Sequence, residues 1–214
     1  METNKIKLST VVATILAIVV VEISSRFLIS QKIVADFTGL GLARAAEIIL
    51  LLAIVKVRHQ RISTIGLAAP DIYNGFKKGL IWSVLFGAVA GICLLIIHLA
   101  GIQISGLFLM RLPAGGSQLA IFFLVGALIG PIAEEIFFRG ILYGFFRRWG
   151  VPTAIVLSTL LFVIPHTFGS IIPVTQLVGG ILFAVAYEIE KNLLVPIIIH
   201  CLGNLAIFTF ALII

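Results

Sequence analysis

The chain alternates between long apolar runs and short clusters of charged residues. Histidines aside, four runs contain no charged side chain: Gly79–Met110, Leu112–Ala133, Trp149–Tyr187 and Asn192–Ile214. Two less uniform apolar segments precede them. Because a transmembrane helix needs about 20 mainly apolar residues, the pattern predicts seven membrane-spanning helices, at residues 8–29, 39–57, 78–99, 117–148, 152–166, 172–188 and 192–213.

The composition excludes a soluble globular protein. Of the 214 residues, 61% are hydrophobic and 11% are charged, whereas soluble domains average about 45–50% apolar and about 25% charged residues. The predicted fold class is an all-α, polytopic membrane bundle of about seven transmembrane helices. About three spans lie in an N-terminal part, residues 1–116, and about four in a core, residues 117–214. We expect part of 100–116 to be a loop or an interfacial segment.

The basic residues indicate an orientation. A net charge of +6 in a soluble protein would suggest nucleic acid, but here the charges lie between apolar runs, as the positive-inside rule describes. A cytoplasmic N-terminus places 11 of the 15 Lys and Arg residues on the cytoplasmic side. We therefore expect a multi-pass protein of a prokaryotic plasma membrane, with its first span retained, the lipid bilayer as a partner and no nucleic acid. Cys93 and Cys201 are predicted to be inert thiols.

Charged residues within the apolar spans need partners, because each costs about 2.5–3.5 kcal/mol on insertion scales. The first two spans contain Glu22 with Arg26, and Arg44 with Glu47. These spacings of four and three residues place each pair on one helix face. We expect two local ion pairs near the outer membrane interface.

The fourth span carries a denser cluster, Glu134, Glu135 and Arg139. Glu135 and Arg139 are four residues apart and can pair, whereas Glu134 points about 100° away around the helix. A free carboxylate in a low-dielectric site is suited to general-base chemistry. The alternative is a helix end at the membrane surface, where both carboxylates are solvated.

Two further polar positions fall at matching depths. His166 ends the fifth span, and His200 and Asn204 share one face of the seventh. At 1.5 Å per residue, Glu134 and His166 both lie about 21 Å from the turn near residues 149–152. His200 and Asn204 lie about 12–18 Å from the turn near 191–192. All four groups are thus predicted to occupy one slab of the membrane.

Such a cluster can activate water. Glu134 would accept a proton from it, and a histidine would orient the water or hold a metal that lowers its pKa. Asn204 could donate a hydrogen bond to a developing oxyanion. Arg139 would hold Glu135 and keep the helix in register.

Three motifs in these spans resemble those of one family. E-E-x-x-x-R at Glu134–Arg139, F-x-x-x-H at Phe162–His166 and H-x-x-x-N at His200–Asn204 are similar to the motifs of the CPBP family. That family comprises type II CAAX prenyl endopeptidases and bacteriocin-processing or abortive-infection-like membrane proteases. The resemblance covers about residues 117–214.

The resemblance implies an intramembrane endopeptidase acting on membrane-associated substrates. Its substrate would be a hydrophobic or lipidated peptide, with a prenylated CAAX-type peptide as one form. Its catalytic residues would be Glu134, Glu135, Arg139, His166, His200 and Asn204. Two mechanisms stay open: one uses a water activated by a glutamate without a metal, and the other uses a divalent metal such as zinc.

Two other classes of function are compatible with the same polar residues. A non-enzymatic membrane protein that binds peptides, such as an immunity factor, would keep the cavity without proton transfer. A transporter would use the carboxylates and histidines as a proton relay, but transporters commonly contain two repeats with broken helices, and we find no repeat in the sequence.

Overall fold

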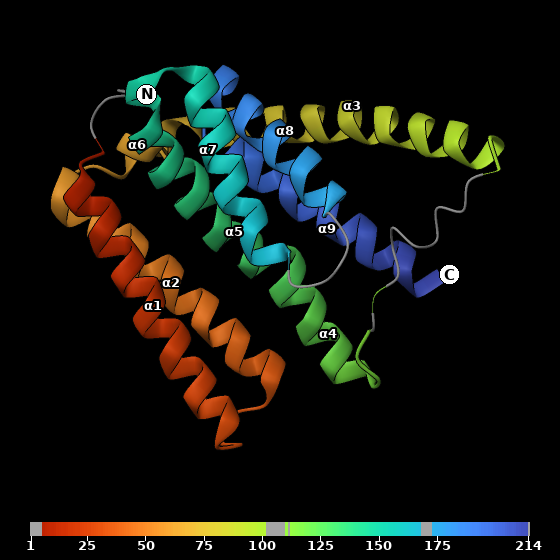
Figure 1. Cartoon of the computed structure of the whole chain (residues 1–214), viewed down its shortest axis with the longest axis horizontal. Helices are drawn as coiled ribbons and strands as arrows, with labels where there is room; N and C mark the ends of the chain where they lie inside the picture. The colour runs from red at the N-terminus through yellow and green to blue at the C-terminus, as the bar shows by residue number, and fades with distance from the viewer. Residues whose placement is uncertain (1–5, 102–109, 111, 168–172, 214) are drawn as a thin grey trace.

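The described part of the chain is a bundle of long helices (Figure 1). The computed structural model describes residues 6–101, 110, 112–167 and 173–213. Their helices are α1 Leu8–Ser30, α2 Asp36–His59, α3 Ile72–Leu99, α7 Val151–Val163, α8 Val174–Glu190 and α9 Leu194–Ile213. Short 3-10 turns are η1 Ile62–Ile65, η2 Ala69–Asp71 and η7 Ile164–His166.

A further continuous helix, Gly116–Trp149, is 34 residues long and is called the central helix below. It changes geometry along its length: α4 Gly116–Leu124, π-helical η4 Val125–Ile129, α5 Gly130–Glu135, π-helical η5 Ile136–Tyr143, α6 Gly144–Phe146 and 3-10 η6 Arg147–Trp149.

Each of the seven predicted spans coincides with a helix, which confirms the all-α membrane bundle. Within the described ranges, four helical stretches are long and apolar enough to cross a membrane: Leu8–Ser30, Ala69–Leu99, Gly116–Trp149 and Leu194–Ile213. The largest difference is at α3, which begins at Ile72 rather than at residue 78. The prediction for 100–116 lies largely outside the described residues. The division of the chain at 116/117 and its orientation in the membrane stay predictions.

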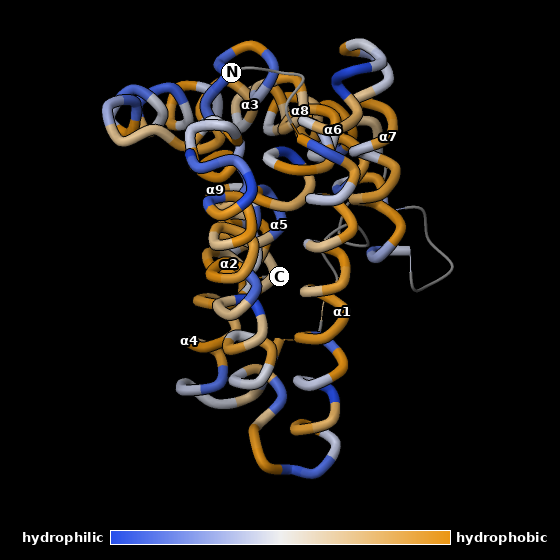
Figure 2. The backbone as a smooth tube through the Cα atoms, turned by 90° about the vertical axis from the view of Figure 1, so that its left-hand side faces the viewer, coloured by the Kyte–Doolittle hydropathy of each residue, from blue (hydrophilic) through white to orange (hydrophobic). Residues whose placement is uncertain are grey.

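The helices pack around the central helix. α1 and α2 form a pair, and α2 and α9 both contact the central helix at η4 and α5. α7 packs on η5 and on α8, and α3 packs on α9 (Figure 1). Hydrophilic positions gather near the N-terminal end of the bundle and at the turn between α1 and α2 (Figure 2). The middle of the bundle is mainly hydrophobic, as burial in lipid requires.

The turns that align the last four helices occur where the sequence predicts them. Gly150 links the central helix to α7 with φ +101°, a conformation that favours glycine, and Pro152 follows in the first turn of α7. Lys191 ends α8 in the left-handed region. The side-chain Oδ1 of Asn192 then accepts a hydrogen bond from the Leu194 N–H at 2.9 Å, at the start of α9.

The first π-helical segment has a local cause. Pro131 lacks an N–H, and in the π register its partner would be the carbonyl of Gly126, five residues earlier. That carbonyl instead accepts a hydrogen bond from Asn204 Nδ2 of α9 at 2.8 Å. A neighbouring helix therefore satisfies a backbone group that the proline leaves free, as is common in membrane helices.

The charges of α1 and α2 extend one prediction. Arg44 and Glu47 pair at 2.6 Å and Glu22 and Arg26 at 3.7 Å, as expected, but Glu22 also lies 2.8 Å from Arg44. The two expected pairs are therefore joined into one network, Glu22–Arg44–Glu47, with the exposed Arg26 beside it. The reason is that α1 and α2 pack side by side, so that a cation on one helix reaches carboxylates on both.

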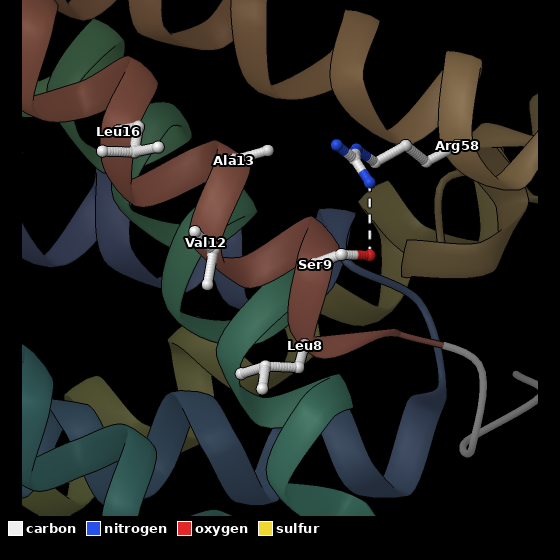
Figure 3. A pocket seen from close by; sticks show the side chains of 6 residues that line it. All are labelled: Leu8, Ser9, Val12, Ala13, Leu16 and Arg58. Carbon is white, nitrogen blue, oxygen red and sulfur yellow. Dashed lines mark hydrogen bonds between the residues drawn. The ribbon is translucent and has the colours of Figure 1, made fainter.

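An open depression of about 480 Å³ lies at the N-terminal end of α1 (Figure 3). Arg58 of α2 reaches it and donates a hydrogen bond to Ser9 Oγ at 3.2 Å. None of its lining residues belongs to the polar cluster of the last four helices; they are Leu8, Ser9, Val12, Ala13, Leu16 and Arg58.

Candidate active site

The two adjacent glutamates end α5, between the two π-helical segments, and they face different surroundings. The Glu135 side chain is fully buried, whereas 24% of the Glu134 side chain is exposed. π-Helical segments occur frequently at functional sites, because they change the direction in which side chains project from a helix. Glu134 is therefore the accessible carboxylate of the pair and Glu135 the enclosed one.

Glu135 is the centre of a buried ion-pair network. Its Oε1 accepts hydrogen bonds from Arg139 Nη1 at 2.8 Å and from His200 Nδ1 at 2.8 Å. Arg139 is fully buried as well. The predicted pairing of Glu135 with Arg139 is confirmed, and the contact with His200 adds a link from the central helix to α9.

Arg139 is held from a third helix and by two aromatic rings. Its Nη2 donates a hydrogen bond to the carbonyl of Gly180 in α8 at 3.1 Å. Its guanidinium carbon lies 4.5 Å from the ring centroid of Phe162 and 5.1 Å from that of Phe183, within the range of cation–π attraction. Arg139 thus joins α7 and α8 to the central helix, a link between helices that the sequence analysis did not predict.

The position of Gly180 depends on its lack of a side chain. A Cβ atom there would lie 2.9 Å from a methyl group of Thr159 and 3.2 Å from the Phe162 ring. The glycine lets α8 approach α7 closely enough for its carbonyl to reach Arg139.

The His200 ring is fixed on three sides. It stacks on Phe183 at a centroid distance of 4.7 Å and an interplanar angle of 22°, and it meets Phe162 edge-on at 5.7 Å. Because the Glu135 carboxylate can only accept, Nδ1 carries the proton of their hydrogen bond. The other ring nitrogen, Nε2, faces Glu134, with 3.8 Å between Nε2 and Glu134 Oε2.

A separation of 3.8 Å is too long for a direct hydrogen bond and short enough for one bridging water to bond to both atoms. One water molecule can lie about 2.8 Å from both atoms at once. Glu134 and His200 together therefore have the geometry to bind and polarise a single water.

His166 and Asn204 lie at the margin of this group. His166 is exposed, and its Nδ1 lies 2.8 Å from the carbonyl of Phe162. The Phe162 ring contacts both histidines, with centroid distances of 5.0 Å to His166 and 5.7 Å to His200. Within the described residues no hydrogen bond or ion pair joins His166 to Glu134. Asn204 lies one helical turn beyond His200 and donates to Gly126.

The structure therefore brings Glu135, Arg139 and His200 into direct contact, with Glu134 at 3.8 Å from His200, and places the other two predicted residues around them. Sequence reasoning missed Phe183 and Gly180. A phenylalanine and a glycine in an apolar helix have no distinctive signal, although their spacing of three residues does place them on one face of α8.

The donor set does not suit a metal ion. Among the described residues, no group of three or more His, Cys, Asp and Glu side chains converges as a metal site would require. The Nδ1 of His200 and Oε1 of Glu135 are already bonded to each other.

Fold and site together define an integral membrane protein with a buried carboxylate–arginine–histidine network beside an accessible carboxylate. Residues 116–206 match the family described as type II CAAX prenyl endopeptidase Rce1-like. This match contains all three motifs and confirms, for that segment, the resemblance inferred from them.

One curated relative is the membrane-embedded CAAX protease MroQ of Staphylococcus aureus (strain USA300). It is 34% identical over an alignment of 102 residues, and the match covers 44% of this chain and 41% of the relative. The chain thus matches less than half of that relative's length. No solved structure matches the chain.

Proposed function

We propose that this protein is an intramembrane endopeptidase that hydrolyses peptide bonds with a water activated by Glu134 and His200. The observation that carries the proposal is the 3.8 Å separation of Glu134 Oε2 and His200 Nε2, with the histidine held by Glu135 on its other side. The match of residues 116–206 to prenyl endopeptidases supports the same class of reaction.

In the proposed reaction, Glu134 removes a proton from the bridging water while Nε2 of His200 orients it. The water oxygen attacks the peptide carbonyl carbon, and a tetrahedral intermediate forms. The carbon–nitrogen bond then breaks, and the proton held by Glu134 passes to the leaving amine. The products are a carboxylate and an amine, so that one water is consumed for each bond cleaved.

The other predicted residues have supporting roles in this proposal. Glu135 and Arg139 are positioning residues, because Glu135 Oε1 holds His200 and the two terminal nitrogens of Arg139 bond to Glu135 and to α8. Asn204 uses one amide hydrogen for Gly126, and its second can stabilise an oxyanion. His166 is exposed, and in this proposal it contacts the substrate rather than the water.

The proposed substrate is a membrane-associated peptide that is hydrophobic or lipidated. The curated relative is named as a CAAX protease, which makes a prenylated C-terminal peptide the first substrate to test. A bundle surrounded by lipid suits such a substrate, because its apolar part can stay in the bilayer while the peptide reaches the polar site.

The test is cleavage by the purified protein in detergent, with a farnesylated CAAX reporter and a panel of unprenylated leader peptides. Glu134→Gln should reduce kcat/KM by at least about 100-fold, the usual lower value for general-base catalysis. Glu190→Gln is the matched control, since Glu190 pairs with Trp82 and Lys78, outside the site.

Full activity of Glu134→Gln would refute the assignment of the base. If the wild type binds these peptides without cleaving any, and Glu134→Gln binds them equally, the protein is a peptide-binding membrane protein instead.

A further inference from the structure

The depression at the start of α1 is an apolar hollow beside a row of exposed side chains (Figure 3). Leu8, Val12 and Leu16 follow one another at intervals of four residues on one face of α1, and each of them is between 47% and 60% exposed. The smaller residues Ser9 and Ala13 line the hollow of about 480 Å³ next to this row. The candidate active site uses none of these residues, so the hollow has no function yet.

One cation reaches the hollow, and it has no acidic partner. Arg58 is the charged residue among those that line it. Within the described ranges no carboxylate pairs with Arg58, and its side-chain hydrogen bond is the one that Nη1 donates to Ser9 Oγ at 3.2 Å. The other N–H groups of the guanidinium remain available. Ser9 Oγ accepts from Arg58 and can still donate its own hydrogen. The two side chains therefore offer adjacent donors to an anion.

A second contact fixes these donors in place. The buried Thr10 lies next to Ser9 in the chain, and its Oγ1 is 3.0 Å from Nε2 of His59, which follows Arg58. Two successive residues at the start of α1 thus bond to two successive residues at the end of α2. The separation between Arg58 and the apolar row therefore belongs to the fold rather than to one flexible side chain.

The order of groups along α1 is that of a phospholipid. α1 is one of the helices that can cross a membrane, and Ser9 and Arg58 lie at the hydrophilic end of the bundle (Figure 2). Leu16 lies about 10 Å further along the helix, in the direction of the bilayer interior. A guanidinium binds phosphate oxygens well, and an acyl chain fits an apolar hollow that runs away from them.

We propose that this hollow binds one anionic phospholipid, with its phosphate on Arg58 and Ser9 and an acyl chain along the row of Leu8, Val12 and Leu16. The lipid is anionic because Arg58 has no carboxylate beside it, so that a net negative headgroup supplies the missing charge. A second depression of about 240 Å³, between α1 and α2 near their turn, is lined by uncharged residues alone and lacks this preference. The inference is independent of the proposed endopeptidase function.

The experiment titrates the purified protein in detergent with phosphatidylglycerol. Native mass spectrometry measures the dissociation constant of the first bound lipid for Arg58→Gln and for its matched control, Arg61→Gln. Arg61 is exposed just after α2 and does not line the hollow. Both variants lose one charge and the same general attraction to anionic lipid. Arg58→Gln also loses the hydrogen bonds to the phosphate, so it should bind about tenfold more weakly than Arg61→Gln, or weaker still.

A second pair of variants tests the apolar part. Ala13→Phe fills the hollow and changes no charge, so it should also weaken the binding of phosphatidylglycerol about tenfold. Ala88→Phe is the control, because Ala88 is exposed on α3, away from the hollow; it should bind as the wild type does. If Ala13→Phe does not fold, Ser9→Ala replaces it. Ser9 is exposed, and the loss of its hydroxyl should weaken binding several-fold.

Two further ligands identify the occupant. The wild type should bind zwitterionic phosphatidylcholine several-fold more weakly than phosphatidylglycerol, and a large excess of inorganic phosphate should not displace the bound lipid. Equal binding of the two lipids, or equal dissociation constants for Arg58→Gln and Arg61→Gln, would overturn the inference. Displacement by phosphate would instead indicate a site for a free anion. A dimer in the same spectra that Ala13→Phe abolishes would assign the hollow to a second copy of the chain and would also overturn it.

Discussion

Replacing Arg139 with methionine tests the buried network most directly. Arg139 and Glu135 are both fully buried and lie 2.8 Å apart. Removing one partner of such a pair leaves an uncompensated charge, which costs about 3–5 kcal/mol. The variant also deprives the Gly180 carbonyl of its donor. We therefore expect Arg139→Met to lower the free energy of unfolding by an amount in the upper half of that range.

The double variant Glu135→Gln/Arg139→Met separates charge from packing. It removes both charges, and a glutamine oxygen can still accept from His200 Nδ1. Replacing a buried ion pair by uncharged groups of similar size is often nearly neutral, so the double variant should be more stable than Arg139→Met by about 2 kcal/mol or more.

The assay is reversible unfolding in mixed detergent micelles, followed by far-ultraviolet circular dichroism. Arg26→Met serves as the control, because an exposed ion pair contributes about 0–1 kcal/mol. A loss below about 1 kcal/mol for Arg139→Met, comparable to an exposed pair, would refute the reasoning. A double variant that is no more stable than Arg139→Met would also refute the reasoning. The loss of stability in Arg139→Met would then arise from lost packing rather than from the charge left on Glu135.

Three further predictions concern the supports of the site. Gly180→Ala should destabilise the protein by about 1–3 kcal/mol through overpacking. Gly203→Ala should not, because a Cβ atom at Gly203 meets open space. The unfolding midpoints of the two variants test this, and equal midpoints would contradict it. Asn204→Leu should cost about 1–3 kcal/mol, because it leaves a carbonyl of the first π-helical segment without its donor; an unchanged midpoint would contradict this. Phe183→Leu removes the ring stacked on His200 and should lower kcat about tenfold with little change in KM; an unchanged kcat in the reporter assay would show that the stacking does not orient the histidine.

Local patterns in the chain account for the helices and for one contact of the site. Predominantly apolar segments predicted all seven helices, because each helix satisfies its own backbone in lipid and needs only enough apolar residues to span it. The Glu135–Arg139 pair followed from a spacing of four residues within one helix. Both results depend on neighbours along the chain, which the sequence lists directly.

Contacts between helices were decided by packing. His200 and Glu135 are 65 residues apart in sequence, and their 2.8 Å contact requires α9 to lie against the central helix at one particular rotation. The same applies to Glu22, which finds Arg44 on the next helix in preference to Arg26 on its own. A depth estimate placed His166 level with Glu134, but depth leaves the rotation of a helix about its axis free. That rotation is set by how side chains interdigitate between helices, and it decides which polar groups meet.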